Sequence, residues 1–452
     1  MSEKKETPVA DFVRDYRDRD FLRLHMPGHK GRGEAEALDI TEIHGADPLY
    51  PAKGILRESE ENAAALFGAG RTVFSAEGSS LSIRAMLFLV RIRAEQRHLR
   101  PLVLAGRNAH RTFLSAAALL NLEVAWLPGE SLLTCTPGAD ETEDAIRRLN
   151  PAAVYLTSPD YLGNRADIRG IARVCRAHGV PLLVDNAHGA YLRFLPEDEH
   201  PLTLGADMTC DSAHKTLPVL TGGGWLHIHR DADPIFASQA ERAMAAFAST
   251  SPSWLILQSL DRCNAYLKNG YRERLAAFRT RVDETRERLR AAGWRMTGDE
   301  ALKITLLPKA RGYTGDALHD LLRERRIECE FSDPDFLVMM LTPETGEEGL
   351  IRLTDALTEI PARPEIAETP PEIPRPERAM SLPAAMTAPA EEVPVEKSPG
   401  RILADPCVSC PPAVPILISG ERIDDQAVRC FRYYGISTVS CVISAFDPDV
   451  RA

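Results

Sequence analysis

Between residues 55 and 228, short apolar stretches alternate with segments whose apolar residues recur at helical spacing. An uninterrupted apolar stretch is typical of a strand that is buried on both faces, as in a parallel sheet covered by helices. Strands separated by helices indicate βαβ units, so we expect an α/β fold with a mostly parallel sheet flanked by helices. The expected strands are residues 72–74, 101–105, 153–157, 180–184, 208–210 and 225–228.

The helical segments are marked by their spacing and by glycines where they end. Gly68 and Gly179 each follow a helical pattern, and glycine is the residue that most readily ends a helix. The expected helices are residues 9–16, 55–67, 79–91, 112–120, a helix through Ile168 and Cys175, and one long charged helix over residues 254–290.

Changes in composition divide the chain. A polar, glycine-containing arm (residues 1–50) precedes a large α/β domain (51–255), and residues 256–360 begin a smaller domain with the long helix. Residues 361–378 are rich in proline and glutamate, and such a segment buries little, so we expect a linker or a strap across the surface. A small compact α+β subdomain follows, at residues 379–452.

The charge balance and the apolar pattern exclude several classes of protein. The net charge of −11 disfavours a nucleic-acid or acidic-membrane partner. No apolar run is long enough for a membrane helix, and the charged first residues do not resemble a secretory signal. Nine thinly spread cysteines suit a reducing compartment, so we expect a cytoplasmic protein.

Lys215 is the first candidate for chemistry. It lies in Asp211-Ser212-Ala213-His214-Lys215-Thr216, directly after an expected strand. A lysine that forms an imine must be held rigidly and partly desolvated, and strand ends of α/β domains display such groups. Ser212 and His214 are suited to holding an anion beside the amine. A solvated loop with a chance Ser-x-His-Lys is the alternative.

Asp185 ends the apolar strand that precedes the Lys215 strand. In pyridoxal-phosphate (PLP) chemistry a carboxylate faces the pyridine nitrogen and keeps it protonated, so that the ring accepts electrons. The alternative is that Asp185 only caps the turn that follows it. Either feature is common alone, whereas both in this order are not.

Two weaker signals accompany the lysine and the carboxylate. Gly78-Ser79-Ser80 opens a helix, whose free N–H groups and hydroxyls would cradle a phosphate, although Ser79 or Ser80 would serve equally as a plain N-cap. His110 follows a strand, where an imidazole would stack on a flat ring or serve as an ordinary structural hydrogen-bonding group.

Several motifs together resemble the bacterial ornithine/lysine/arginine decarboxylase family, from about residue 20 to about residue 425. The arm motif and the lysine motif are the most specific of them. The motifs are Leu24-His25-Met26-Pro27-Gly28-His29-Lys30-Gly31, Asp39-Ile40-Thr41-Glu42-Ile43, Phe67-Gly68-Ala69, Gly78-Ser79-Ser80, Asp185-Asn186-Ala187-His188-Gly189-Ala190, Ser212-Ala213-His214-Lys215-Thr216-Leu217-Pro218, Ser249-Thr250-Ser251-Pro252-Ser253, Gly400-Arg401-Ile402 and Pro411-Pro412-Ala413-Val414-Pro415.

The resemblance implies a fold-type-I PLP enzyme of the shorter form, without an extra N-terminal domain. It implies that Lys215 forms the Schiff base, that Asp185 faces the ring nitrogen, and that His188 lies near the phenolic oxygen. His110 would stack on the ring, and Ser79, Ser80, Ser212 and His214 would bind the phosphate. Thr250 and Ser251 resemble residues that reach a neighbouring subunit's phosphate, so a homodimer with shared sites is implied, with the arm of residues 27–30 at its boundary.

Four positions depart from the family pattern. Glu77 stands where asparagine is expected, Asn186 replaces a common glutamate, Tyr191 a common histidine and Asp160 a common threonine. These residues flank the cofactor motifs, so they bear on the substrate and not on PLP.

The predicted reaction is decarboxylation of a basic amino acid, with arginine favoured over lysine and ornithine because the shorter forms of the family are often assigned to it. The substrate's distal cation needs an acidic partner, and Glu330 and Asp333 are candidates on an expected strand edge, unless they are solvated surface carboxylates.

Three other functions compete with this one. An aminotransferase or carbon–carbon lyase would hold the substrate carboxylate with an arginine, for which Arg23, Arg107 and Arg165 are candidates. A catalytically silent PLP-binding relative is a second alternative. Zinc or redox chemistry at Cys407 and Cys410 is the third, but one Cys-x-x-Cys pair supplies only two of four zinc ligands.

Overall fold

The computed structural model describes residues 5–127, 129, 131–374, 376–409 and 414–446. Contacts divide the chain into two units, each made of two stretches. Unit 1 comprises Met1–Leu99 and Cys175–Ala276, and unit 2 comprises Arg100–Val174 and Ala277–Ala452. Helix α6 (Ile168–Ala177) begins in unit 2 and ends in unit 1, and helix α11 (Tyr271–Ala291) begins in unit 1 and ends in unit 2.

Unit 1 contains four strands and the helices around them. The strands lie in the order β1, β7, β6, β5, with β5 and β6 parallel and β7 antiparallel to both of its neighbours. Its elements are α1 (Pro8–Asp18), η1 (Glu36–Leu38), α2 (Ile55–Phe67), β1 (Arg71–Ser75), α3 (Gly78–Gln96), β5 (Leu182–Asp185), η2 (Ala190–Phe194), α7 (Pro201–Leu204), β6 (Met208–Asp211), α8 (Ala213–Thr216), β7 (Gly224–Ile228), α9 (Pro234–Ala245) and α10 (Trp254–Lys268).

The strands of unit 1 are buried on both faces because helices cover them. All five residues of β1 and of β7 are buried, and so are all four of β5 and of β6. Helix α3 packs against α9 and against β6 and β7, and α2 packs against β1. This burial explains the apolar run of β5, whereas β1 also buries the polar side chains of Arg71, Thr72 and Ser75.

The register of unit 1 gathers three strand ends at one edge. Ser75, the last residue of β1, pairs with Gly224, and Trp225 pairs with Asp211, the last residue of β6. Asp185, the last residue of β5, pairs with Cys210. The turns that follow β1, β5 and β6 therefore leave the sheet side by side.

A buried carboxylate anchors the N-terminal helix of unit 1. Asp261 Oδ2, on α10, accepts hydrogen bonds from the backbone N–H groups of Val9 (3.0 Å) and Ala10 (2.9 Å) in the first turn of α1. The hydroxyl of Ser59 donates to its other oxygen. Burial raises the pKa of Asp261 to about 7, although these donors oppose the shift.

We expect Asp261 to make the stability of unit 1 depend on pH. A carboxyl whose pKa is raised on folding stabilises the fold fully below its unfolded pKa, and that contribution is lost as the pH rises through about 7. The melting temperature of the wild type should therefore fall, relative to Asp261→Asn, between pH 4 and pH 8. The corresponding change in the free energy of unfolding is a few kcal/mol, roughly 4 at most.

Thermal unfolding of both proteins across this pH range tests the effect. The exposed carboxylate of Asp15, replaced by asparagine, is the matched control, because it should leave the profile unchanged. If the difference in melting temperature between the wild type and Asp261→Asn did not change with pH, Asp261 would not be the source of the pH dependence.

Unit 2 contains three parallel strands in the order β4, β2, β3, a four-stranded antiparallel sheet in the order β10, β11, β9, β8, and two strand pairs, β12 with β15 and β13 with β14. Its elements are β2 (Leu102–Gly106), α4 (Arg111–Leu119), β3 (Glu123–Leu127), α5 (Ala139–Leu149), β4 (Ala153–Thr157), β8 (Met296–Thr297), β9 (Lys303–Leu306), η3 (Pro308–Arg311), α12 (Gly315–Glu324), β10 (Phe331–Ser332), β11 (Leu337–Met340), η4 (Pro343–Thr345), α13 (Gly346–Glu359), α14 (Leu382–Thr387), β12 (Ala390–Pro394), η5 (Val395–Lys397), β13 (Cys407–Ser409), β14 (Pro415–Ile418), α15 (Asp425–Tyr433), β15 (Thr438–Val442) and η6 (Ser444–Phe446).

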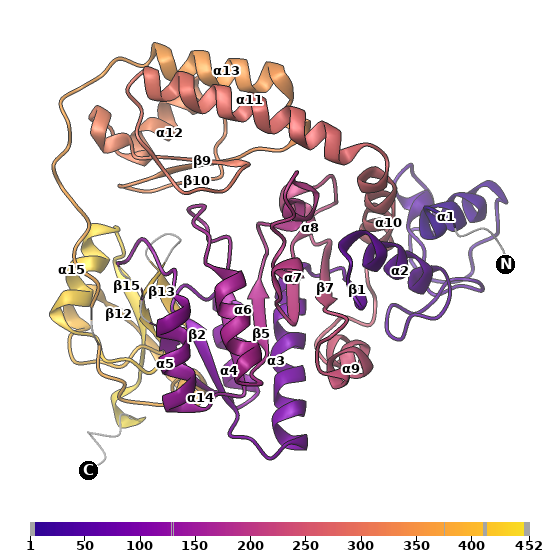
Figure 1. Cartoon of the computed structure of the whole chain (residues 1–452), viewed down its shortest axis with the longest axis horizontal. Coiled ribbons are helices and arrows are strands. Elements are labelled where there is room, and N and C mark those ends of the chain that lie inside the picture. The colour runs from indigo at the N-terminus through magenta and orange to yellow at the C-terminus, as the bar shows by residue number, and fades with distance from the viewer. Residues whose placement is uncertain (1–4, 128, 130, 375, 410–413, 447–452) are drawn as a thin grey trace. The chain divides into compact units, whose positions relative to one another are not determined.

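Within unit 2, α13 lies alongside α11 above the four-stranded sheet (Figure 1). Arg288 of α11 and Asp355 of α13 form an ion pair at 3.3 Å, and Trp294 Nε1 donates to the carbonyl of Leu357 at 3.1 Å. The segment after α13 has no regular element up to residue 377 in its described part, and its backbone is bonded to Lys309 and Arg311. It runs as a strap toward the C-terminal strands.

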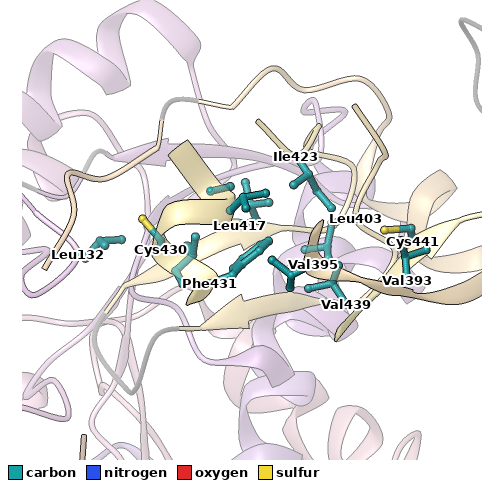
Figure 2. Close-up of a cluster of buried hydrophobic side chains, with 13 residues drawn as sticks. Leu132, Val393, Val395, Leu403, Leu417, Ile423, Cys430, Phe431, Val439 and Cys441 are labelled. Atoms are coloured by element: carbon teal, nitrogen blue, oxygen red, sulfur yellow. The ribbon is translucent and has the colours of Figure 1, made fainter. Parts of the chain in front are cut away.

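The C-terminal part of unit 2 has its own apolar core (Figure 2). Phe431 and Leu417 lie at its centre, and Leu132, from the loop between β3 and α5, completes it. A buried ion pair also joins the residue that follows β2 to this C-terminal part. Arg107 donates to both oxygens of Glu421 at 2.8 and 2.9 Å, and Glu421 also accepts the backbone N–H of Ile418.

The expected strands are all present, with ends that differ by one or two residues. The single long helix expected over residues 254–290 is wrong, because the structure has two helices, α10 and α11. Gly270 lies between them with a φ of +75°, a left-handed conformation that ends a helix. Strand β3 and helices α5, α8 and α9 were not expected. Among the described residues, no helix is long and apolar enough to cross a membrane.

Candidate active site

Lys215 lies in α8, the single helical turn that begins just after β6. Its Nζ is 3.0 Å from Nε2 of His188, in the turn after β5. A lysine ammonium can only donate, so His188 accepts at Nε2 when it is neutral. The parallel pairing of β5 with β6 thus brings together two side chains that the sequence analysis placed in one site.

Asp185 is 2% exposed at the end of β5. Its Oδ1 accepts the backbone N–H of Ala187 at 3.2 Å and the thiol of Cys210 at 3.4 Å. Burial, followed by the negative charges of Asp185 and Asp211, raises the pKa of Cys210 well above its usual value. Cys210 therefore remains a thiol and donates to the carboxylate.

The serine candidates meet where α3 begins. Ser212 Oγ donates to Ser79 Oγ at 2.8 Å, so the Ser79 hydroxyl keeps its own hydrogen for another acceptor. Ser80 follows Ser79 in the first turn of α3, where N–H groups lack partners inside the helix. A side chain at Gly224 would meet the Asp211 carbonyl at 2.8 Å and the Gly78 backbone at 3.2 Å, so only glycine permits this approach.

His214 borders the same corner. Its Nδ1 contacts the carbonyl of Gly223 at 2.9 Å, so Nδ1 carries the proton that it donates. Burial lowers the pKa of His214, and the cation of Lys215 lowers it further, although the Gly223 carbonyl opposes the shift. An anion bound at this corner would favour the protonated imidazole.

Thr250 and Ser251 lie on an exposed loop after α9. The backbone N–H of Ser249 donates to Glu77 Oε1 at 2.7 Å, and the N–H of Ser251 donates to the Ser249 hydroxyl at 3.1 Å. Glu77, which departs from the family pattern, thus anchors the start of this loop.

The remaining candidates belong to unit 2. His110 caps α4, with its Nδ1 accepting the N–H of Thr112 at 3.2 Å. Glu330 is exposed at the edge of the four-stranded sheet and accepts the hydroxyl of Tyr161 at 2.7 Å. Asp333 is buried, and its Oδ1 accepts the N–H groups of Asp335 and Phe336, which are turn-forming contacts. Burial raises the pKa of Asp333 to about 7.

No group of three or more histidine, cysteine or acidic residues in the part of the chain that the structure describes is placed to hold a metal ion. Cys407 lies in β13, whereas Cys410 and residues 411–413 lie outside the described residues.

A buried polar cluster behind Lys215 was missed. Asp211 was quoted in the lysine motif without a role, Asn186 was noted only as a departure, and His200 and His227 were not considered. The one available signal was the acidic residue at the end of a buried strand directly before Ser212.

A model of the Orn/Lys/Arg decarboxylase major domain matches residues 7–306. The chain belongs to this family. A model of the C-terminal domain of Orn/Lys/Arg decarboxylases matches residues 366–441 of this decarboxylase. The resemblance found in the sequence is therefore confirmed, and the protein is an amino-acid decarboxylase.

Relatives of this decarboxylase match over nearly its whole length. The arginine decarboxylase of Bacillus subtilis (strain 168) is 28% identical over 468 residues, which cover 94% of this chain and 92% of that protein. The arginine decarboxylase of Halalkalibacterium halodurans is 29% identical over 475 residues, covering 96% and 94%.

Solved structures show the same fold. A lysine decarboxylase from Francisella novicida superposes with a TM-score of 0.76 at 15% identity and covers 97% of this chain and 81% of that chain. The constitutive lysine decarboxylase of E. coli gives a TM-score of 0.73 at 17% identity, covering 96% and 81%. The expected α/β fold with a smaller C-terminal domain is confirmed.

Proposed function

We propose that this decarboxylase uses PLP bound to Lys215 and acts on arginine in preference to lysine or ornithine. The observation that carries the proposal is the 3.0 Å contact between Lys215 Nζ and His188 Nε2, at the sheet edge where β5 also delivers the buried Asp185. The choice of arginine is supported by the relatives named arginine decarboxylase.

The residues at this edge fit the chemical requirements of PLP. The cofactor needs an amine for its aldehyde, an anion cradle for its phosphate and a carboxylate for its ring nitrogen. Lys215 supplies the amine and Asp185 the carboxylate. The Ser212–Ser79 hydroxyl pair, Ser80 and His214 supply donors around the N-terminus of α3, where the helix dipole favours an anion.

When bound, PLP supplies an electron-accepting ring that stabilises the charge left on the α-carbon as carbon dioxide leaves. Asp185 would hold a proton on the pyridine nitrogen, since its burial excludes water from that carboxylate. Lys215 Nζ, or else His214, would return a proton to the α-carbon. The contact of His188 Nε2 with Lys215 Nζ would hold the amine in place for this transfer.

The family resemblance also assigns roles to candidates in unit 2. His110, whose Nδ1 accepts the Thr112 N–H, is proposed to stack on the cofactor ring. Of the two acidic candidates for the distal cation, exposure favours Glu330. Asp333 is buried, and burial raises its pKa to about 7, which disfavours the charged carboxylate that a cation needs.

The contacts of three arginines weigh against the aminotransferase alternative. Arg107 is held by Glu421, Arg165 forms an ion pair with Asp299 at 3.1 Å, and Arg23 donates to backbone carbonyls, among them that of Ala37. Each candidate for binding a substrate carboxylate is thus engaged within the protein. The presence of Asp185, His188 and Lys215 in one site likewise disfavours a silent relative.

Incubation of the purified protein with arginine, lysine and ornithine separates these functions. We expect release of carbon dioxide and the matching amine, fastest from arginine, and a yellow protein whose absorbance borohydride abolishes. Formation of a keto acid without carbon dioxide would indicate an aminotransferase, and a yellow protein without turnover would indicate a silent relative.

We also propose that the chain forms a homodimer through its arm. Leu22 and Leu24 are 83% and 84% exposed, and Phe21 and Met26 are also largely exposed. Several exposed large apolar side chains in one short segment mark an interaction surface. The partner we propose is a second copy of the chain. The exposed loop of Thr250 and Ser251 supports this choice, because the family resemblance implies that these residues reach a neighbouring subunit.

The double variant Leu22→Asp/Leu24→Asp is therefore expected to dissociate the dimer, because it places two charges in an apolar contact. Light scattering during size-exclusion chromatography should show the mass falling to that of one chain. Leu119→Asp is the matched control, since Leu119 is 74% exposed on α4, away from the arm in the sequence. A double variant that stays dimeric would contradict the assignment.

A further inference from the structure

A charged carboxylate lies buried behind the lysine turn of unit 1. Asp211 has no exposed surface, and it accepts hydrogen bonds from Asn186 Nδ2 to Oδ1 (2.9 Å) and from His200 Nε2 to Oδ2 (2.9 Å). His227 Nε2 lies 3.6 Å from Oδ2. All three of these partners are fully buried as well.

The protonation of this cluster follows from its hydrogen bonds. His200 Nδ1 accepts the backbone N–H of Leu202, so its Nε2 must carry the hydrogen that it donates to Asp211. Burial alone would raise the pKa of Asp211, but the two imidazoles outweigh it and lower the pKa well below its usual range. Asp211 is therefore an ionised acceptor throughout the neutral pH range.

The cluster joins the two turns that carry the proposed catalytic groups. Asn186 lies between Asp185 and His188 in the turn after β5, and its backbone N–H donates to the Cys210 carbonyl at 3.0 Å. Asp211 directly precedes the turn that carries Ser212 and Lys215. The Asn186–Asp211 bond thus spans the ends of two neighbouring strands, and it is a charge-assisted link between them.

We propose that Asp211 is a positioning residue that, through Asn186 and His200, holds the lysine turn at the distance from the His188 turn that the reaction requires. The inference rests on the proposed function of Lys215 and His188. It assigns Asn186 and Asp211 a role in the reaction. Asn186 is one of the four positions that depart from the family pattern.

The cost of burying a charge supports this role over plain stabilisation. A well-packed apolar side chain in place of a buried ionic group is often neutral or stabilising, so a buried carboxylate is weak support for stability alone. Reacting groups, in contrast, must be held within about 0.5 Å of their productive geometry, and hydrogen-bonded supporting residues provide that precision.

Asp211→Asn tests the proposal with almost no change in shape. The asparagine amide can accept at one atom only, so either Asn186 Nδ2 or His200 Nε2 loses its acceptor. Glu60→Gln is the matched control, because Glu60 is also a fully buried carboxylate of unit 1, bonded to Arg71 and to the Phe74 N–H. Both variants should melt at a lower temperature.

Only Asp211→Asn should change Lys215 itself. In the cofactor-free full-length chain, an acylating reagent labels lysines at rates that peptide mapping by mass spectrometry resolves, with the exposed Lys53 as internal reference. We expect at least a threefold change in the Lys215 rate in Asp211→Asn and none in Glu60→Gln. With PLP added, Asp211→Asn should also lower kcat at least tenfold with little change in KM.

An unchanged Lys215 labelling rate in a folded Asp211→Asn chain would overturn the proposal, whatever its melting temperature. If that variant does not fold, Asn186→Ala takes its place, since it removes only the amide and leaves both histidines on Asp211. A wild type that takes up no PLP would defeat the proposed function instead, and the labelling comparison would still decide the positioning role.

Discussion

Lys215→Ala is expected to abolish both the yellow colour and turnover, with a loss of activity on the order of 10³-fold or more. The side chain supplies the amine that holds the cofactor, and it is also one of the two proposed proton donors to the α-carbon. Absorbance spectra before and after borohydride, together with release of carbon dioxide from arginine, measure the two losses separately.

Lys215→Arg is the matched control for this result. The guanidinium keeps the positive charge beside His188 but cannot form the imine, so it should be as inactive as the alanine variant. Lys53→Ala, at an exposed site, should leave activity unchanged. If Lys215→Ala were still yellow and sensitive to borohydride, another lysine would carry the cofactor.

Asp185→Asn is expected to lower turnover by about 10²- to 10³-fold, because a neutral amide would not keep the ring nitrogen protonated. The variant keeps the shape of the side chain, and its oxygen can still accept from the Ala187 N–H. Steady-state kinetics should show the loss mainly in kcat, and PLP binding should weaken.

Asp207→Asn is the natural comparison, since Asp207 is a mostly buried carboxylate at the opposite end of the same strands. Its Oδ2 accepts the N–H of Leu182, the first residue of β5. This variant should change stability and not kcat. Equal kinetic effects of the two substitutions would show that Asp185 acts only as a structural carboxylate.

The sequence predicted the buried strands well, because strands such as β2 and β5, which are buried throughout, contain apolar runs. Strand β3 was missed because its sequence, Glu123 to Leu127, mixes exposed and buried positions. Helix α8 is a single turn, which is too short for any periodicity. The boundary between α10 and α11 depends on one glycine whose left-handed conformation the periodic pattern did not reveal.

The site could be anticipated only where its parts lie close together in sequence. Lys215, His214 and Ser212 share one motif, and Asp185 and His188 share another, so strand ends were enough to group them. The Asp211 cluster joins residues 186, 200, 211 and 227, which lie in the turn after β5, in the loop before α7, at the end of β6 and within β7. Only the register of the sheet, which no local pattern specifies, shows that they meet.

The ion pair between Arg107 and Glu421 connects the residue that follows β2 to the C-terminal part of unit 2. A stop codon before residue 421 would remove the carboxylate that pairs with the buried Arg107, and it would also remove Ile423, Phe431 and the other late members of the apolar core. The last segment is therefore not a dispensable appendage. Shortened versions of this enzyme should be isolated as insoluble material.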